Sequence, residues 1–294
     1  MILLLKLKIV ISGAEFFFID NLFFNINYIT YICLGHGVSF FKPFLYSNHS
    51  YYGNQIYNKI LIPPSKKLIS LVKSYGWKEE DIIKNNLPRW DKFNVQYDEQ
   101  KNKSIFIMFT WRDLNKNQTI SEHYLNNITS LINNYQLIQS LKKKKIACYF
   151  TFHHKVFQNK TITKLNDYIT YIEEKNISNI LSKTDLIITD FSSIIFDFIY
   201  RRKPFIIFIP DINDSSINIK YVKDYSQLIE DMKNNKIEFI NKCFNAAEII
   251  NKINYYIDNN FNLKKEDIQF YETFELKREN NTIKFIEYLK SHLN

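Results

Sequence analysis

From about residue 103 onwards, short apolar runs alternate with segments whose apolar residues have helical spacing. Continuous apolar runs of this length are typical of strands buried on both faces, and the segments between them are long enough for helices. The pattern therefore predicts a doubly wound α/β domain, a parallel sheet with helices on both faces. The predicted strands are SIFIMFTW (104–111), KIACYFTFHH (145–154), DLIITD (185–190) and PFIIFIPD (204–211). The predicted helical segments are 120–141, 177–184, 192–202, 225–235, 245–260 and 275–294.

The first hundred residues are less regular. LKIVIS at 7–12 is typical of a buried strand, a helix is expected to end at Gly76, and KEEDIIK at 78–84 favours a second short helix. We expect a short or incomplete, truncated N-terminal α/β domain over residues 1–97, a linker at 95–103, and a second domain over residues 98–294.

Composition adds little about chemistry. Of the 294 residues, 46% are hydrophobic, which is ample for folded cores, and the net charge is +9. A basic chain suits phosphorylated substrates, nucleic acid or an anionic membrane surface, but lysines scattered over solvated helices would give the same total. The three cysteines lie far apart without metal-ligand spacing, which favours a reducing compartment. The apolar stretch at the N-terminus, about 11 residues, is too short to span a bilayer.

The segment from Asp185 to Phe208 carries the strongest chemical signal. A predicted strand ends at Asp190, and Ser192 and Ser193 open the next helix. Hydroxyls and exposed backbone N–H groups at such a position suit a phosphate or diphosphate. Asp197 lies four residues after Ser193, on the same helical face. An ordinary N-cap would give the same pattern.

Histidine supplies two further candidates. His36 stands between Gly35 and Gly37 in a chain with only five glycines. It is either a buried histidine at a tight turn or a base open to a substrate. His153 and His154 end a predicted strand, where only one of the pair can face a site, or they belong to an ordinary loop.

Two arginines have suitable positions as well. Arg112 in FTWRD follows the first strand of the second domain and could hold a phosphate bidentately. Arg89 in LPRWD lies at a turn near the domain junction. A structural salt bridge would explain either of them.

Several alternatives lack a sequence signature. There is no Gly-rich phosphate loop, no GxSxG elbow, and no close group of His, Cys and carboxylates that would suit a metal. The basic residues form no nucleic-acid recognition module.

Taken in order, the motifs resemble the CDP-glycerol glycerophosphotransferase family, whose members build teichoic acids and related polyol-phosphate polymers. The resemblance covers roughly residues 30–290. It rests on LGHGVSFFK (34–42), NNLPRWD (85–91), FTWRD (109–113), FTFHHKVF (150–157) and LIITDFSSIIFDF (186–198).

The resemblance implies a two-domain GT-B fold with the active site in the cleft between domains. An acceptor hydroxyl would attack the β-phosphate of CDP-glycerol and release CMP, without a metal or another cofactor. His36 would be the general base, and His153 would contact the donor phosphate or assist the leaving group. On the donor side the resemblance places Arg112, Arg89, Asp190, Ser192, Ser193 and Asp197.

The implied partners are a CDP-activated polyol donor and an anionic polymer or lipid-linked acceptor, with no nucleic acid. The expected location is the cytoplasm, with peripheral attachment to the inner face of the cell membrane. Two alternatives stay open. One is a GT-B glycosyltransferase that uses a nucleotide sugar for surface polysaccharide. The other is an inactive truncated fragment, since only 35 residues precede His36.

Overall fold

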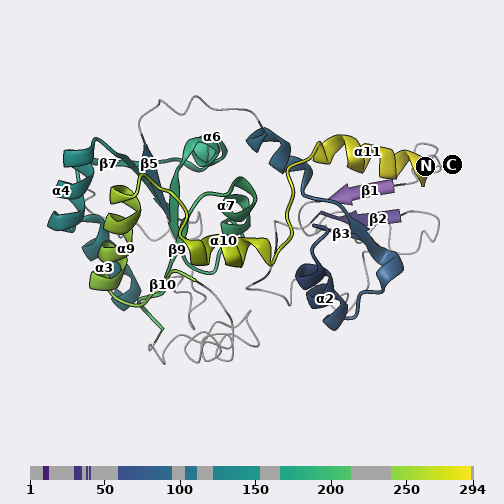
Figure 1. The fold of residues 1–294 in the computed structure, drawn as a ribbon, viewed down its shortest axis with the longest axis horizontal. Coiled ribbons are helices and arrows are strands. Elements are labelled where there is room, and N and C mark those ends of the chain that lie inside the picture. The colour runs from purple at the N-terminus through teal and green to yellow at the C-terminus, as the bar shows by residue number, and fades with distance from the viewer. Residues whose placement is uncertain are drawn as a thin grey trace. The chain divides into compact units, whose positions relative to one another are not determined.

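The computed structural model describes residues 9–12, 30–34, 38, 40, 59–94, 103–110, 122–152, 166–212 and 240–292. The chain forms two compact units. The first comprises Met1–Val95 together with Tyr271–Asn294, and the second comprises Gln96–Phe270. Each unit is built on its own parallel sheet (Figure 1).

The first unit contains a four-stranded parallel sheet in the order β1-β2-β3-β4. The predicted strand at 7–12 is confirmed as β1. The helix predicted at 78–84 is wrong, because only Glu79–Asp81 form a 3₁₀ turn before β4 begins. Ile82 and Ile83 are adjacent, β-branched and buried against β3, which favours a strand. The strands are β1 (Ile9–Ser12), β2 (Thr30–Cys33), β3 (Lys59–Ile62) and β4 (Ile82–Lys84).

Helix α2 (Lys66–Ser74) follows β3 and is amphipathic. Ser65 is its N-cap and accepts a hydrogen bond from the Leu68 amide at 3.4 Å. Leu68 and Val72, four residues apart, are fully buried. Gly76 has a φ of +92°, so the helix ends where the sequence predicts.

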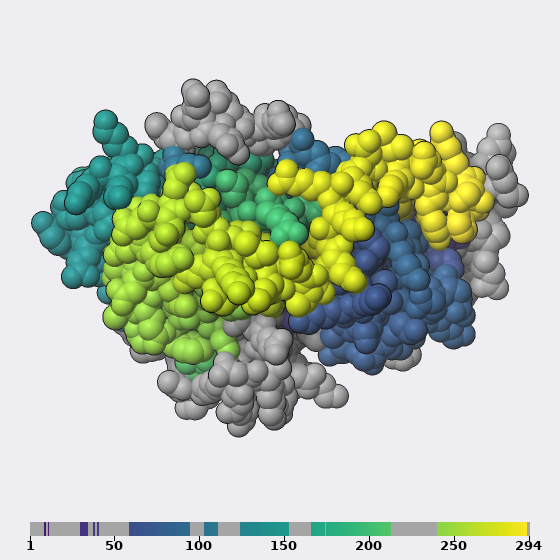
Figure 2. All heavy atoms as spheres, viewed as in Figure 1, coloured from purple at the N-terminus to yellow at the C-terminus, as the bar shows by residue number. Residues whose placement is uncertain are grey.

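Helix α11 (Asn281–Ser291) packs on the first unit, although it lies at the far end of the chain. The Asp91 carboxylate accepts hydrogen bonds from the amides of Asn281 at 2.8 Å and Thr282 at 2.7 Å. The Asn85 side chain donates to the carbonyl of Asn281 at 3.0 Å. Figure 2 shows these C-terminal residues in yellow against the blue of residues 59–94. The structure therefore places residues 271–294 with the first unit, whereas the sequence assigned them to the domain at 98–294.

The second unit contains a six-stranded, wholly parallel sheet in the order β10-β9-β8-β5-β6-β7. It confirms the predicted doubly wound domain. Its strand order is that of dinucleotide-binding folds, in which the direction of winding reverses between the first and fourth strands. The short strands β7 and β10 were not predicted. The strands are β5 (Ser104–Phe109), β6 (Ala147–Phe152), β7 (Ile169–Tyr171), β8 (Leu186–Thr189), β9 (Phe205–Phe208) and β10 (Lys242–Cys243).

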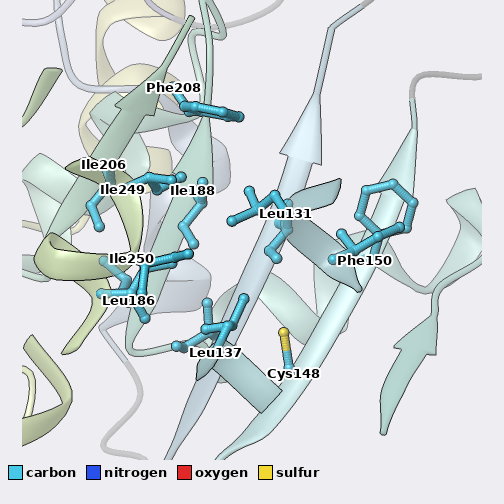
Figure 3. Close-up of a cluster of buried hydrophobic side chains, with 14 of the residues drawn as sticks. Leu131, Leu137, Cys148, Phe150, Leu186, Ile188, Ile206, Phe208, Ile249 and Ile250 are labelled. Carbon is cyan, nitrogen blue, oxygen red and sulfur yellow. The ribbon is translucent and has the colours of Figure 1, made fainter. Parts of the chain in front are cut away.

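Helices cover both faces of this sheet (Figure 1). The core on one face joins the strands to α3, α4 and α9 and consists of aliphatic and aromatic side chains, among them Leu131, Leu137, Phe150, Ile188 and Ile249 (Figure 3). Helices α6 and α7 contact β5 and β8. The helices are α3 (Glu122–Ile132), α4 (Tyr135–Lys144), α6 (Ile177–Lys183), α7 (Ile195–Arg201), α9 (Ala246–Asp258) and α10 (Lys265–Glu272). A further 3₁₀ turn spans Glu174–Asn176.

Most predicted helical segments are confirmed, with two differences. The segment at 120–141 forms two helices, because Asn134 caps α4 by accepting from the Leu137 amide at 3.1 Å. Helix α10 was not predicted. The segment at 225–235 lies outside the described residues. Among the helices that the structure describes, none has the length and apolar character needed to cross a bilayer.

The buried thiols allow a test of this fold. Burial raises the pKa of Cys148 and of Cys243 to about 12, whereas Cys33 is half-buried. Three pKa units lower the thiolate fraction at neutral pH by about 10³-fold, and the thiolate is the reactive form. We expect iodoacetamide to add at most one label to the native protein, at Cys33, and three labels in guanidinium chloride, counted by mass spectrometry. Rapid labelling of Cys148 in the native protein would contradict the packing of β6.

Candidate functional site

The candidate site lies where β5 and β8 run side by side. They pair in parallel, with Ile107 opposite Ile188, so that Phe109 and Thr189 end their strands at the same edge of the sheet. The sheet continues on one side through β9 and on the other through β6. In open α/β sheets, ligands bind outside the carboxyl ends of the strands at this reversal point.

A buried carboxylate joins the two strand ends. Asp190 directly follows β8 and has no exposed surface. Its Oδ1 accepts the Thr110 amide at 3.0 Å, and its Oδ2 accepts the Thr110 hydroxyl at 2.9 Å. The Tyr124 hydroxyl of α3 donates to the same Oδ2 at 2.8 Å. Asp190 therefore ties β8, β5 and α3 together at the candidate site.

Ser192 and Ser193 follow in the turn that leads into α7, and both are half-buried. The Ser192 hydroxyl accepts the Ile194 amide at 3.4 Å, and the Phe196 amide donates to the Ser193 carbonyl at 3.1 Å. The helix begins two residues after Ser193. The two serines are thus placed at the carboxyl edge beside the reversal point, and phosphate binding by them stays a prediction.

Asp197 lies inside α7 and is fully buried. Asp190, which directly follows β8, is also fully buried. Neither carboxylate has exposed surface, and the donor-side role that the sequence suggested for both residues stays a prediction.

Three predicted site residues, His36, Arg112 and His153, lie outside the described residues. In the sequence each follows the end of a parallel strand by one to three residues, after β2, β5 and β6 respectively. The carboxyl ends of β5 and β6 are adjacent, since Phe109 pairs with Phe152.

Arg89 belongs to the first unit. It is exposed in the 3₁₀ helix Pro88–Phe93, next to the fully buried Trp90 and the α11-binding Asp91. Asp91 of the LPRWD motif thus anchors α11 within the first unit.

The structure also adds Thr110 and Tyr124 to the candidate site, and the sequence analysis did not single out either residue. Thr110 lies inside the predicted strand at 104–111 and within FTWRD, and it directly follows β5, whereas nothing near Tyr124 in the sequence marks it.

A metal ligand set is not found in the part of the chain that the structure describes. No three His, Cys, Asp or Glu side chains come together there in a group that could hold an ion. Among the described residues that follow β5 and β8, Thr110, Ser192 and Ser193 carry hydroxyls, and the buried Asp190 carboxylate accepts hydrogen bonds from its neighbours.

Comparison with known proteins is consistent with this architecture. Residues 29–275 match the family described as CDP-glycerol:poly(glycerophosphate) glycerophosphotransferase. The minor teichoic acid biosynthesis protein GgaB of Bacillus subtilis strain 168 is 28% identical over 285 residues, which cover 88% of this chain and 29% of GgaB. The teichoic acid glycerol-phosphate primase of the same strain is 24% identical over 189 residues, 62% of this chain and 45% of the primase.

A solved structure shares the fold. A histidine-to-asparagine variant of the wall teichoic acid polymerase TagF, soaked with CDPG, superimposes with a TM-score of 0.59 at 15% identity. The match covers 98% of this chain and 74% of that structure. The chain spans less than half the length of either curated relative.

Proposed function

Because the chain belongs to the CDP-glycerol:poly(glycerophosphate) glycerophosphotransferase family, we propose that it transfers glycerol phosphate, or a similar polyol phosphate, from a CDP-activated donor to an acceptor hydroxyl and releases CMP. The acceptor is a cell-envelope polymer or a lipid-linked primer. Peripheral attachment to the inner face of the cell membrane is part of the same proposal.

One observation carries the proposal. The family match extends over residues 29–275 and includes all five motifs. The described part of the fifth motif places Ser192 and Ser193 at the carboxyl edge, beside the strand reversal where such folds bind nucleotides. The position is physically suited to a diphosphate, since hydroxyls and backbone amides can hold phosphate oxygens.

The reaction that we propose is a displacement at phosphorus. The acceptor oxygen forms a bond to the β-phosphorus of the donor while the bond from that phosphorus to the bridging oxygen breaks, and CMP leaves with the electron pair. His36 takes the acceptor's proton, because an imidazole with a pKa near 6.5 is neutral at physiological pH.

Other groups stabilise the charge that moves to the leaving group. Arg112 neutralises negative charge on the phosphates, and His153 contacts the donor phosphate or assists the leaving CMP. Ser192 and Ser193 hold the diphosphate. These roles come from the family resemblance and from the order of the motifs along the chain.

The identity of the released nucleotide tests the proposal. The chain is incubated with a glycerol-phosphate-primed acceptor and either CDP-glycerol or a UDP-sugar, and nucleotides are resolved by ion-exchange chromatography. We expect CMP from CDP-glycerol, growth of the acceptor by glycerol phosphate, and no UDP above the no-enzyme control. Release of UDP with sugar transfer would instead favour a glycosyltransferase. Tight CDP-glycerol binding without turnover would favour a fragment that only binds.

A further inference from the structure

The buried hydrogen-bond network at the reversal point joins three segments that are distant in sequence. Asp190 and its partners Thr110 and Tyr124 are all buried, and Tyr124 and Asp190 have no exposed surface. The Tyr124 ring also packs edge-on against Phe109, with centroids 6.3 Å apart. The aromatic contact and the hydrogen bond together fix α3 against the end of β5.

The network has a direct physical consequence for the end of β8. A buried carboxylate is costly unless donors surround it, and here an amide and two hydroxyls donate to it. These bonds hold the Asp190 side chain against Thr110 and Tyr124, directly after the end of β8. Ser192 is two residues further along the chain, so the turn before α7 starts from a position that the network sets.

We propose that Tyr124 is a positioning residue, which acts through Asp190 to hold the Ser192–Ser193 turn in the geometry that binds the donor diphosphate. This inference rests on the proposed function. Tyr124 is fully buried and makes no ligand contact of its own. Its hydroxyl and the Thr110 hydroxyl both donate to Asp190 Oδ2, so that the carboxylate is held against α3 and the end of β5.

The test is Tyr124→Phe, which keeps the ring and removes the hydroxyl. We expect the KM for CDP-glycerol to rise about fivefold to tenfold, less than the full loss of a hydrogen bond to a charged group, because Tyr124 acts on the donor only through Asp190, with kcat changed less than about twofold. Thr110→Val should shift KM in the same direction, and Thr110→Ser, which retains the hydroxyl, should stay near the native value.

Tyr168→Phe is the matched control. The Tyr168 hydroxyl donates to the carbonyls of Leu141 at 3.1 Å and Ile146 at 3.0 Å, so this variant also loses a bonded hydroxyl. Ile146 precedes β6, so this tyrosine lies at the opposite edge of the sheet from Asp190. We expect the KM of Tyr168→Phe to match that of the native chain. Thermal unfolding of every variant, followed by circular dichroism, measures the loss of stability separately.

Calorimetric titration with CDP-glycerol tests the positioning role of Tyr124 separately from the proposed transfer reaction. If the native chain releases no CMP, the proposed function fails, and the positioning role is still read from a Kd that rises in Tyr124→Phe and not in Tyr168→Phe. If the native chain turns over and Tyr124→Phe has native KM and Kd, the inference is overturned. Equal losses of stability in both tyrosine variants without a change in KM or Kd would likewise overturn it.

Discussion

Replacement of His36 by alanine is expected to lower the rate of CMP release from CDP-glycerol by about 10³-fold, the largest effect that we predict for a single side chain. An acceptor hydroxyl is a weak nucleophile until a base removes its proton in the transition state. His36 is the residue to which the family resemblance assigns that task. CDP-glycerol binding should be nearly unchanged, because the donor is held by other groups.

The measurement is the initial rate of CMP release at saturating donor and acceptor, with calorimetric Kd values for CDP-glycerol. His292→Ala is the control, since His292 is exposed at the end of α11 and its ring Nδ1 lies 2.8 Å from the Tyr288 carbonyl. A native rate in His36→Ala would remove the histidine from the mechanism.

Replacement of Asp91 by alanine is expected to lower the free energy of unfolding by about 2 kcal/mol, the largest stability effect that we predict. Asn280 precedes α11 but makes no side-chain cap, and the Asp91 carboxylate accepts the first two amides of the helix instead. Its negative charge also lies at the positive end of the helix dipole. Removal of the carboxylate takes away the hydrogen bonds that it accepts from these two amides. It also weakens the contact between the two segments of the chain that form the first unit.

Urea unfolding followed by circular dichroism measures this loss. Asp258→Ala is the matched control, because Asp258 forms only an exposed ion pair with Lys144 at 3.2 Å, for which we expect less than about 0.5 kcal/mol. Asp91→Asn, which keeps one acceptor oxygen, should fall between the two. Equal midpoints for Asp91→Ala and Asp258→Ala would contradict the capping role.

The pH dependence of this effect has a defined sign. Burial raises the pKa of Asp91, but hydrogen bonds from Thr282 and Asn281 outweigh it, so that the pKa lies below its usual 3.8. A depressed carboxyl pKa gives stability that is present above the pKa of the unfolded chain and is lost as the pH falls through the pKa of the folded chain. The difference between native chain and Asp91→Ala should therefore be constant from about pH 5 to 8 and shrink below about pH 4.

The sequence predicted the parts of the fold that depend on local pattern. Continuous apolar runs such as LIIT of β8 are buried throughout, so their burial leaves a plain signal in the residue types. The three-residue strand β7 was missed because only Ile169 is buried and the run is too short to show a period. KEEDIIK was misread because polar residues precede two isoleucines whose strand state depends on pairing with β3.

The long-range contacts could not be predicted in this way. Asp91 and Thr282 are 191 positions apart, and Tyr124 and Asp190 are 66 apart. The residues around Asp91 carry no pattern that predicts its contact with the first amides of α11, so far along the chain. The motifs nevertheless indicated the candidate site, because Ser192 and Ser193 directly follow a strand end at the edge where parallel sheets bind ligands.

The most direct test of the account is the fate of the phosphorus atom next to glycerol. CDP-glycerol labelled with ³²P at that phosphorus is incubated with the chain and a glycerol-phosphate-primed acceptor, and label is counted in polymer and nucleotide fractions. Phosphoryl transfer predicts that the label enters the polymer in step with the appearance of unlabelled CMP. Label that stays in the nucleotide fraction as CDP while the acceptor is extended would contradict it.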